Sequence, residues 1–442
     1  MEKNENEEAA FISTVEQFEL EVEDKKEPDS KYTSILTLIA ICNMSFLVGL
    51  NNTSFAHIIE ISLNMYSSQY FPEHHPLLAK LPPIFYHIGG LISAIVSYNI
   101  KKVDFKKILK FSCALLLIAY CLTIAYPHIL VIYLTRILIG FATGCMCIII
   151  PQILHKMAEG TGKSAQLMTI FPFSLMSGLT MAVAWGLITT STNYIYINLI
   201  PIILSALGFF SLNHTIPLKV QIKDKKKQSL WSFMYNSLSV RSFLHIIMLH
   251  FFSKTTGIDI LVFFSSDLFK GKHSKFFSLL PLVLATLFTL TGGFVPDRLG
   301  RKIPFVLGLL GIAVLHLLIY FIGPNIFIFL LFMVFFFSGL NSVPFISQNE
   351  VVPEEFKTTA NELGGIVSWL LGFLMTAFVS LMLTKQSLNV WLIVFCLTLI
   401  GLVLVVILMK ETNGLQQTDF ITKFLNYDSW YKAREIKVDE AI

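Results

Sequence analysis

The chain has 442 residues, of which 54% are hydrophobic and only 14% are charged. A soluble globular protein carries about 25% charged residues and could not bury so large an apolar fraction in ordinary domain cores. These values exclude a soluble protein and predict a polytopic membrane protein, with the lipid bilayer as its partner. Basic residues lie in short loops, which is typical of a cytoplasmic membrane face and not of a nucleic-acid-binding surface.

The first 33 residues form an acidic segment. Residues 1–33 hold eleven acidic side chains and four lysines. A segment that is acidic and poor in aromatic residues is typically solvated and disordered. It also lacks the apolar core and small-residue cleavage site of a secretory signal peptide. We therefore expect a disordered cytoplasmic tail at 1–33.

Twelve apolar runs follow this tail. A helix needs about 20 mostly apolar residues to cross the hydrocarbon core of a bilayer. The runs lie at residues 35–58, 78–100, 108–126, 129–153, 165–188, 194–213, 242–268, 276–296, 303–323, 325–348, 360–384 and 389–409. Gly323 and Pro324 separate the ninth run from the tenth.

A polar stretch divides the twelve spans into two sets of six. The sequence predicts an all-α membrane protein with a six-helix bundle at 34–213, a basic cytoplasmic linker at 214–241, a second six-helix bundle at 242–409 and a cytoplasmic tail at 410–442. Lysine and arginine gather in alternate loops, which predicts that both termini are cytoplasmic. Two halves joined in this way are typical of secondary transporters with a binding site near the membrane midplane.

Short motifs occur at the ends or in the middle of several spans. Residues 297–302 read Asp-Arg-Leu-Gly-Arg-Lys after the eighth span, and Glu350 begins an E-x-x-P-x-x-x-K pattern that ends at Lys357. In the fourth span, Arg136 begins an R-x-L-x-G pattern. The seventh span contains Thr-Gly-Ile-Asp at 256–259, and Glu-Thr-Asn-Gly follows the twelfth span at 411–414.

In this order the motifs resemble those of the sugar porter family of the major facilitator superfamily. Within that family, the short, phenylalanine-rich chain is most similar to the insect facilitated trehalose transporters. The resemblance implies a transporter, not an enzyme, that moves trehalose or glucose across the plasma membrane by alternating access. It also implies gating roles for the charged motif residues, which are Arg136, Asp297, Arg298, Arg301, Glu350 and Lys357.

The motifs of the first half depart from the family pattern. The loop after the second span, residues 99–107, is basic but lacks the D-R-x-G-R pattern. Lys156 stands where the family has a glutamate after the fourth span, and Lys163 lies near the family's arginine. We expect a weakened charge network in the first half and a latch in the second half formed by Glu350 with Arg298 and Arg301.

The expected substrate site also departs from the family. The sugar porters use two adjacent glutamines and an asparagine in the seventh span and a tryptophan in the tenth; Ser253, Lys254, Asp259 and Phe345 stand at those places. Trp369 in the eleventh span retains the family residue. The expected substrate-binding residues are Asn51, Ser253, Lys254, Asp259, Asn341, Phe345 and Trp369, and Gln348 could line the same face.

Lys254 and Asp259 are unusual because charges within a span are costly and often functional. Five residues separate them, which places them roughly 140° apart around an unbent helix. Gly257 lies between them and could distort the helix enough to bring them together. Two readings stay open: a structural ion pair, or groups that bind the polar parts of a substrate or move a proton.

Asn51 bears on energy coupling. It lies in the first span where proton-coupled relatives carry an aspartate, and an amide does not titrate. This favours a facilitator, although Asn51 could instead satisfy a helix break. Two alternatives to sugar transport stay open: transport of another polar or charged solute, and a transport-poor nutrient sensor. No cofactor, metal site or disulfide is expected, since all six cysteines lie in apolar runs.

Overall fold

The structure is a computed structural model. It describes residues 30–53, 81–99, 104–126, 128–158, 169–188, 194–215, 237–268, 274–352, 357–384 and 389–412. The regular elements in these ranges are all helices. Three predicted segments lie mostly outside the described residues: the acidic tail, the basic linker and the carboxy-terminal tail. Lys163 also lies outside them.

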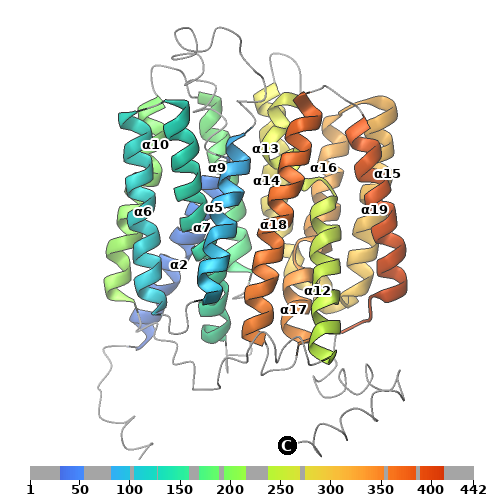
Figure 1. Cartoon of the computed structure of the whole chain (residues 1–442), viewed down its shortest axis with the longest axis horizontal. Coiled ribbons are helices and arrows are strands. Elements are labelled where there is room, and N and C mark those ends of the chain that lie inside the picture. The colour runs from blue at the N-terminus through green and yellow to red at the C-terminus, as the bar shows by residue number, and fades with distance from the viewer. Residues whose placement is uncertain are drawn as a thin grey trace, which may run out of the picture.

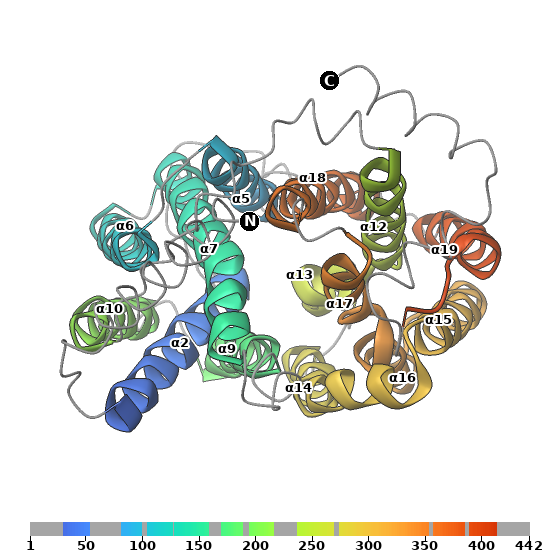
Figure 2. The same ribbon diagram turned by 90° about the horizontal axis from the view of Figure 1, so that it is seen from below.

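The first six predicted spans are confirmed as six helices of one bundle (Figures 1 and 2). A short 3₁₀ turn, η1 (Leu212–His214), continues the last of them. The six helices are α2 (Ser30–Thr53), α5 (Pro82–Asn99), α6 (Phe105–Ala125), α7 (Ile129–Ala158), α9 (Ile170–Ile188) and α10 (Tyr194–Ser211).

The other six spans form a second bundle beside the first (Figure 2). Gly323, with a φ of 84°, ends the ninth span as expected. The seventh and tenth predicted spans are each divided into shorter helices. The elements are α12 (Ser237–Thr255), α13 (Ile258–Leu268), α14 (Ser274–Leu299), α15 (Lys302–Ile322), α16 (Ile326–Phe335), the π-helical turn η2 (Phe336–Leu340), α17 (Val343–Glu350), α18 (Lys357–Thr384) and α19 (Asn389–Leu408).

Both interruptions have a local cause. Between α12 and α13, Gly257 adopts a φ of 79°, a left-handed conformation that only glycine adopts readily. In the tenth span, the N–H of Asn341 bonds the carbonyl of Phe336 over five residues, which is a π-helical bond. Pro344 then lies in the first turn of α17, where its missing N–H costs no helical hydrogen bond.

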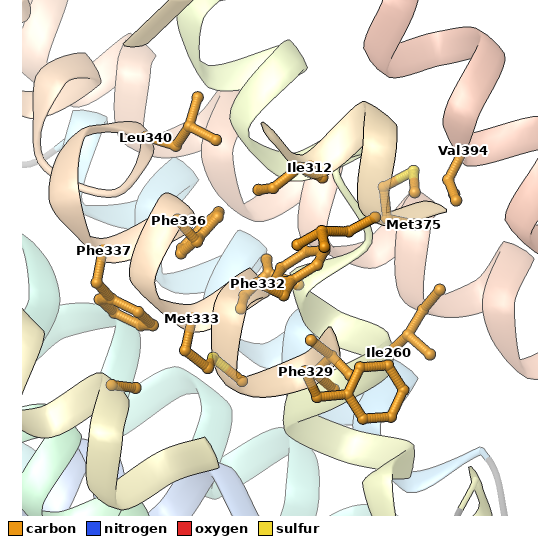
Figure 3. Packing of buried hydrophobic residues seen from close by; sticks show 14 of the residues in the cluster. Ile260, Ile312, Phe329, Phe332, Met333, Phe336, Phe337, Leu340, Met375 and Val394 are labelled. Carbon is orange, nitrogen blue, oxygen red and sulfur yellow. The ribbon is translucent and has the colours of Figure 1, made fainter. Parts of the chain in front are cut away.

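Apolar side chains cover the outer faces of both bundles, as expected for contact with lipid. Phe321, Ile322 and Phe327 are each more than 70% exposed. Seven segments among the described residues have the length and composition to cross a membrane, and three further apolar helices are shorter. Inside the second bundle, Phe329, Phe332, Phe336 and Phe337 are buried in an apolar core with residues of α12, α13, α15 and α18 (Figure 3).

The two bundles meet along two pairs of helices, α5 with α18 and α9 with α14 (Figure 2). At the first contact, the ring of Trp369 lies where a side chain at Gly90 would stand, so only glycine permits this approach. At the second, the hydroxyl of Thr180 donates to the carbonyl of Leu282 at 3.0 Å and lies 2.8 Å from the hydroxyl of Thr286.

Candidate functional site

The break in the seventh span brings two charged residues together. Lys254 lies in the last turn of α12 and Asp259 in the first turn of α13, so each charge lies at the helix end that favours it. The ammonium of Lys254 is 3.9 Å from Oδ1 of Asp259. An unbroken helix would separate these side chains; the turn at Gly257 removes that separation.

Buried hydrogen bonds hold the break in place. The hydroxyl of Thr256 donates to the carbonyl of Ser253 at 2.6 Å, and Nε2 of His316 on α15 donates to the carbonyl of Thr256 at 2.9 Å. The hydroxyl of Ser253 donates to the carbonyl of Leu340 at the end of η2, at 2.9 Å. Ser253, an expected substrate contact, therefore joins the two interrupted spans to each other.

The two side chains of the charged pair differ in their exposure. The side chain of Lys254 is 29% exposed and that of Asp259 only 7% exposed. Oδ2 of Asp259 is buried and has no hydrogen-bond partner among the described residues. Buried carboxylate oxygens are normally satisfied, so this oxygen is an exception that calls for a functional explanation.

The opposite bundle contributes a histidine near the charged pair. His87 on α5 interacts electrostatically with both Asp259 and Lys254. Its Nδ1 donates to the carbonyl of Pro83 at 2.8 Å, which orients the ring. The ring packs edge-to-face on Trp369 at 5.8 Å between centroids. No sequence motif marks His87, and only the tertiary structure shows that it lies near the charged pair.

The tenth span supplies a polar network on the other side of Lys254. Nε2 of His250 donates to Oε1 of Gln348 at 3.1 Å, and Nε2 of Gln348 donates to Oδ1 of Asn361 on α18 at 2.6 Å. Phe345 is exposed and lies edge-to-face on His250 at 5.0 Å. Asn341 is half-buried after the π-helical turn. His250 also interacts electrostatically with Lys254, one helical turn further along α12, and so connects this network to the charged pair.

Asn51 lies elsewhere, inside the first bundle. Its side chain is fully buried, and Oδ1 accepts a short hydrogen bond from the hydroxyl of Tyr120. Nη1 of Arg136, also buried, donates to the carbonyl of Asn51 at 3.3 Å. The structure thus brings Asn51 to Arg136, an expected gating residue, and the hydrogen bonds of Asn51 among the described residues reach neither Lys254 nor Asp259.

A second charged cluster, formed around Arg301, lies at one end of the second bundle. Arg301 Nη2 is 2.7 Å from Oε1 of Glu350, its Nε also donates to Glu350, and its Nη1 is 3.1 Å from Asp297. Arg298 is exposed and forms no ion pair with a described residue, so of the two arginines expected to pair with Glu350 only Arg301 does so. Lys357 is the first residue of α18.

The carboxy-terminal motif joins this cluster. The hydroxyl of Thr412 donates to Oε2 of Glu350 at 2.5 Å. Glu411 accepts from the backbone N–H groups of Arg301 and Lys302 at 2.8 and 3.0 Å, which caps α15. Gly300, with a φ of 85°, leaves room for this carboxylate. The motif at 411–414 was the signal for these contacts, but its sequence alone did not indicate which residues it binds.

Three relatives match parts of the chain. A probable quinate permease of Aspergillus fumigatus is 25% identical over 211 residues, which is 41% of this chain and 38% of the permease. Hexose transporter 1 of Plasmodium falciparum is 26% identical over 214 residues, which is 44% of this chain and 42% of that transporter. The facilitated trehalose transporter Tret1 of Anopheles gambiae is 21% identical over 211 residues, which is 43% of this chain and 27% of that transporter. Each match spans less than half of the relative's length.

The fold and the family model agree over most of the chain. The structure is similar to that of the proton:xylose symporter XylE bound to 6-bromo-6-deoxy-D-glucose, with a TM-score of 0.72 and 14% identity over 89% of this chain and 99% of that one. XylE of E. coli in a partially occluded inward-open conformation gives a TM-score of 0.71. The family model described as "Sugar (and other) transporter" matches residues 36–218 and 213–424. The chain therefore belongs to the sugar (and other) transporter family, the sugar porters of the major facilitator superfamily, and has their twelve-helix fold.

Proposed function

We propose that this protein is a facilitative sugar transporter that works by alternating access, with trehalose or glucose as its first candidate substrates. The observation that carries the proposal is the placement of Lys254 and Asp259 at a break between two half-helices, within electrostatic range of His87 in the other bundle. Broken helices that meet between two bundles are the usual substrate sites of secondary transporters. The relatives named as hexose and trehalose transporters support a sugar. By extension from the family, the protein would act in the plasma membrane with both termini cytoplasmic.

Asn51 supports facilitation without proton coupling. The amide accepts from Tyr120 and its backbone carbonyl accepts from Arg136, so the position is buried next to a cation. An asparagine there cannot release or bind a proton in the physiological range. The gradient of the substrate would then be the driving force.

Transport of a charged solute is the second candidate. The observation that favours it is the presence of a cation and an anion between the bundles, with one carboxylate oxygen unpartnered among the described residues. An organic cation would bind Asp259, and an organic anion would bind Lys254.

Uptake into oocytes tests the proposal. We expect saturable uptake of labelled trehalose or glucose that is equal at external pH 5.5 and 7.5 and is lost in Asp259→Ala and Lys254→Ala, with surface expression measured for each variant. Water-injected oocytes give the background. Surface protein that takes up neither sugar would overturn the sugar assignment and direct the search to ionic substrates or to sensing.

A further inference from the structure

The ion pair between Lys254 and Asp259 is open compared with the ion pair between Arg301 and Glu350. The nitrogen–oxygen distance of 3.9 Å exceeds the 2.7–2.9 Å of a charge-assisted hydrogen bond. Arg301 and Glu350, by contrast, meet at 2.7 Å, and both oxygens of Glu350 are bonded. A buried structural ion pair needs such close geometry to offset the loss of hydration. The open pair lacks this geometry and leaves Oδ2 of Asp259 unpartnered among the described residues.

Hydrogen-bond chemistry limits the group that fits this pair. An oxygen can lie about 2.8 Å from both Lys254 Nζ and Asp259 Oδ1 when those atoms are 3.9 Å apart. It must accept from the ammonium and donate to the carboxylate. A hydroxyl does both, whereas an ammonium group only donates and a carboxylate only accepts. Either ion would also lie close to a like charge.

The remaining groups favour a ligand with several hydroxyls. Oδ2 of Asp259 offers an acceptor beside Oδ1, which suits the neighbouring hydroxyl of a polyol. Lys254 and Asp259 together carry no net charge, so a neutral ligand leaves no uncompensated charge between the bundles.

We propose that Lys254 and Asp259 act as one donor–acceptor unit that binds adjacent hydroxyl groups of a neutral polyol and discriminates against charged analogues. The inference rests on the proposed function and defines its substrate class. The charged pair then takes the place of amide side chains as a group that can both donate and accept. The presence of two charged residues suggests an ionic substrate, but the geometry of this pair selects a neutral substrate.

Binding to the purified full-length protein in lipid nanodiscs tests this inference separately from transport. The probes are labelled glucose and labelled trehalose, with unlabelled glucosamine and gluconate as cationic and anionic competitors. We expect glucosamine and gluconate to need concentrations on the order of tenfold or more above that of glucose to displace the label, because each leaves one partner unsatisfied.

Variants separate ligand binding from a structural role. Lys254→Met and Asp259→Asn should each weaken binding on the order of tenfold to a hundredfold. The double variant K254Q/D259N has no unpaired charge and keeps donors and acceptors, so it should recover to within about tenfold of the wild type. Thr255→Val, which removes only a local bond to the carbonyl of Phe252, is the matched control and should bind like the wild type. Gel filtration confirms the folding of each variant, and the double variant remains informative if a single variant does not fold.

The outcomes are distinguishable. Wild-type affinity in both single variants would show that the pair does not contact the ligand, and it would overturn the inference while leaving sugar transport intact. A failure of the folded double variant to recover would also count against the donor–acceptor unit. Gluconate or glucosamine binding more tightly than glucose, or folded wild-type protein that binds neither sugar, would overturn both this inference and the proposed sugar transport.

Discussion

At the scale of single residues, Asn51 decides whether a titratable group lies beside Arg136. Both residues are buried, and Nη1 of Arg136 lies 3.3 Å from the backbone carbonyl of Asn51. Nδ2 of Asn51 has no hydrogen-bond partner among the described residues, while Oδ1 accepts from Tyr120. Replacing this amide with a carboxylate would change its charge without changing its shape.

Asn51→Asp should therefore make uptake depend on pH. The new carboxylate would lie next to the Arg136 guanidinium, and its protonation would change the charge of a buried site. We expect labelled glucose uptake to change by about twofold or more between external pH 5.5 and 7.5, against equal uptake in the wild type. Asn43→Asp is the comparison variant, because it places a carboxylate on the same helix about two turns away; it also loses the bond that Nδ2 of Asn43 donates to the carbonyl of Leu204. Uptake that stays independent of pH in N51D would contradict a coupling role for this position.

At the scale of secondary structure, the interrupted seventh span positions the candidate site. The positive φ of Gly257 allows the chain to turn between α12 and α13, and His316 satisfies a carbonyl that the break releases. The tenth span is interrupted at nearly the same depth, since Ser253 donates to the carbonyl of Leu340. Two breaks that satisfy each other's backbone groups are stable within a membrane-spanning bundle.

Gly257→Ala should destabilise this arrangement. A left-handed conformation costs a residue with a Cβ about 1–2 kcal/mol, so the variant should melt at a lower temperature and lose sugar affinity as Lys254 and Asp259 separate. Thermal unfolding of the purified protein and labelled glucose binding measure the two effects. Gly365→Ala on α18 is the matched control, because its Cβ would meet only Ile148, at an ordinary 3.9 Å. Equal losses in both variants would show that the left-handed turn is not the cause.

At the scale of the whole molecule, the two bundles differ in the polar contacts that hold the starts of α6 and α15. In the second bundle, Glu411 caps α15 and Lys302 donates to the carbonyl of Val406 at 2.8 Å. In the first, Asp104 caps α6 from within its own loop, and Lys106 donates to the carbonyl of Asn213 at 3.3 Å. The cluster around Arg301 adds an ion pair with Glu350, and we propose that this cluster is the principal latch at the expected cytoplasmic end.

Glu350→Gln should shift the balance between the two transport states. It removes the charge that faces Arg301 and weakens bonds worth about 1.5–3 kcal/mol each to charged partners. We expect altered glucose uptake and altered thiol labelling of Cys147, a half-buried residue of α7, quantified by mass spectrometry. Arg298→Gln is the control, since Arg298 is exposed and pairs with no described acidic residue. Unchanged labelling and uptake in E350Q would argue against a latch.

The number and order of the spans could be predicted because the bilayer requires each one to be a run of about 20 apolar residues. Local motifs were sufficient to predict the family, because each motif, such as residues 297–302 or 350–357, is a continuous stretch that can be read directly from the sequence. The unusual charges of Lys254 and Asp259 were also visible, as was the glycine between them. Their proximity was only a possibility, because it depends on the backbone angle at Gly257 and on a bond from His316, sixty residues away.

The sequence by itself determined that this is a twelve-span protein of the sugar porters, because hydrophobic length and contiguous motifs are local properties. Only the tertiary structure decided which polar groups meet. It placed Asn51 with Tyr120 and Arg136, His87 beside the charged pair, Glu411 on the backbone of α15, and Arg301 alone of the two arginines on Glu350. These contacts join distant segments. The physical reason is that a polar group inside a membrane protein must find a partner, and a long polar side chain can find it on another helix.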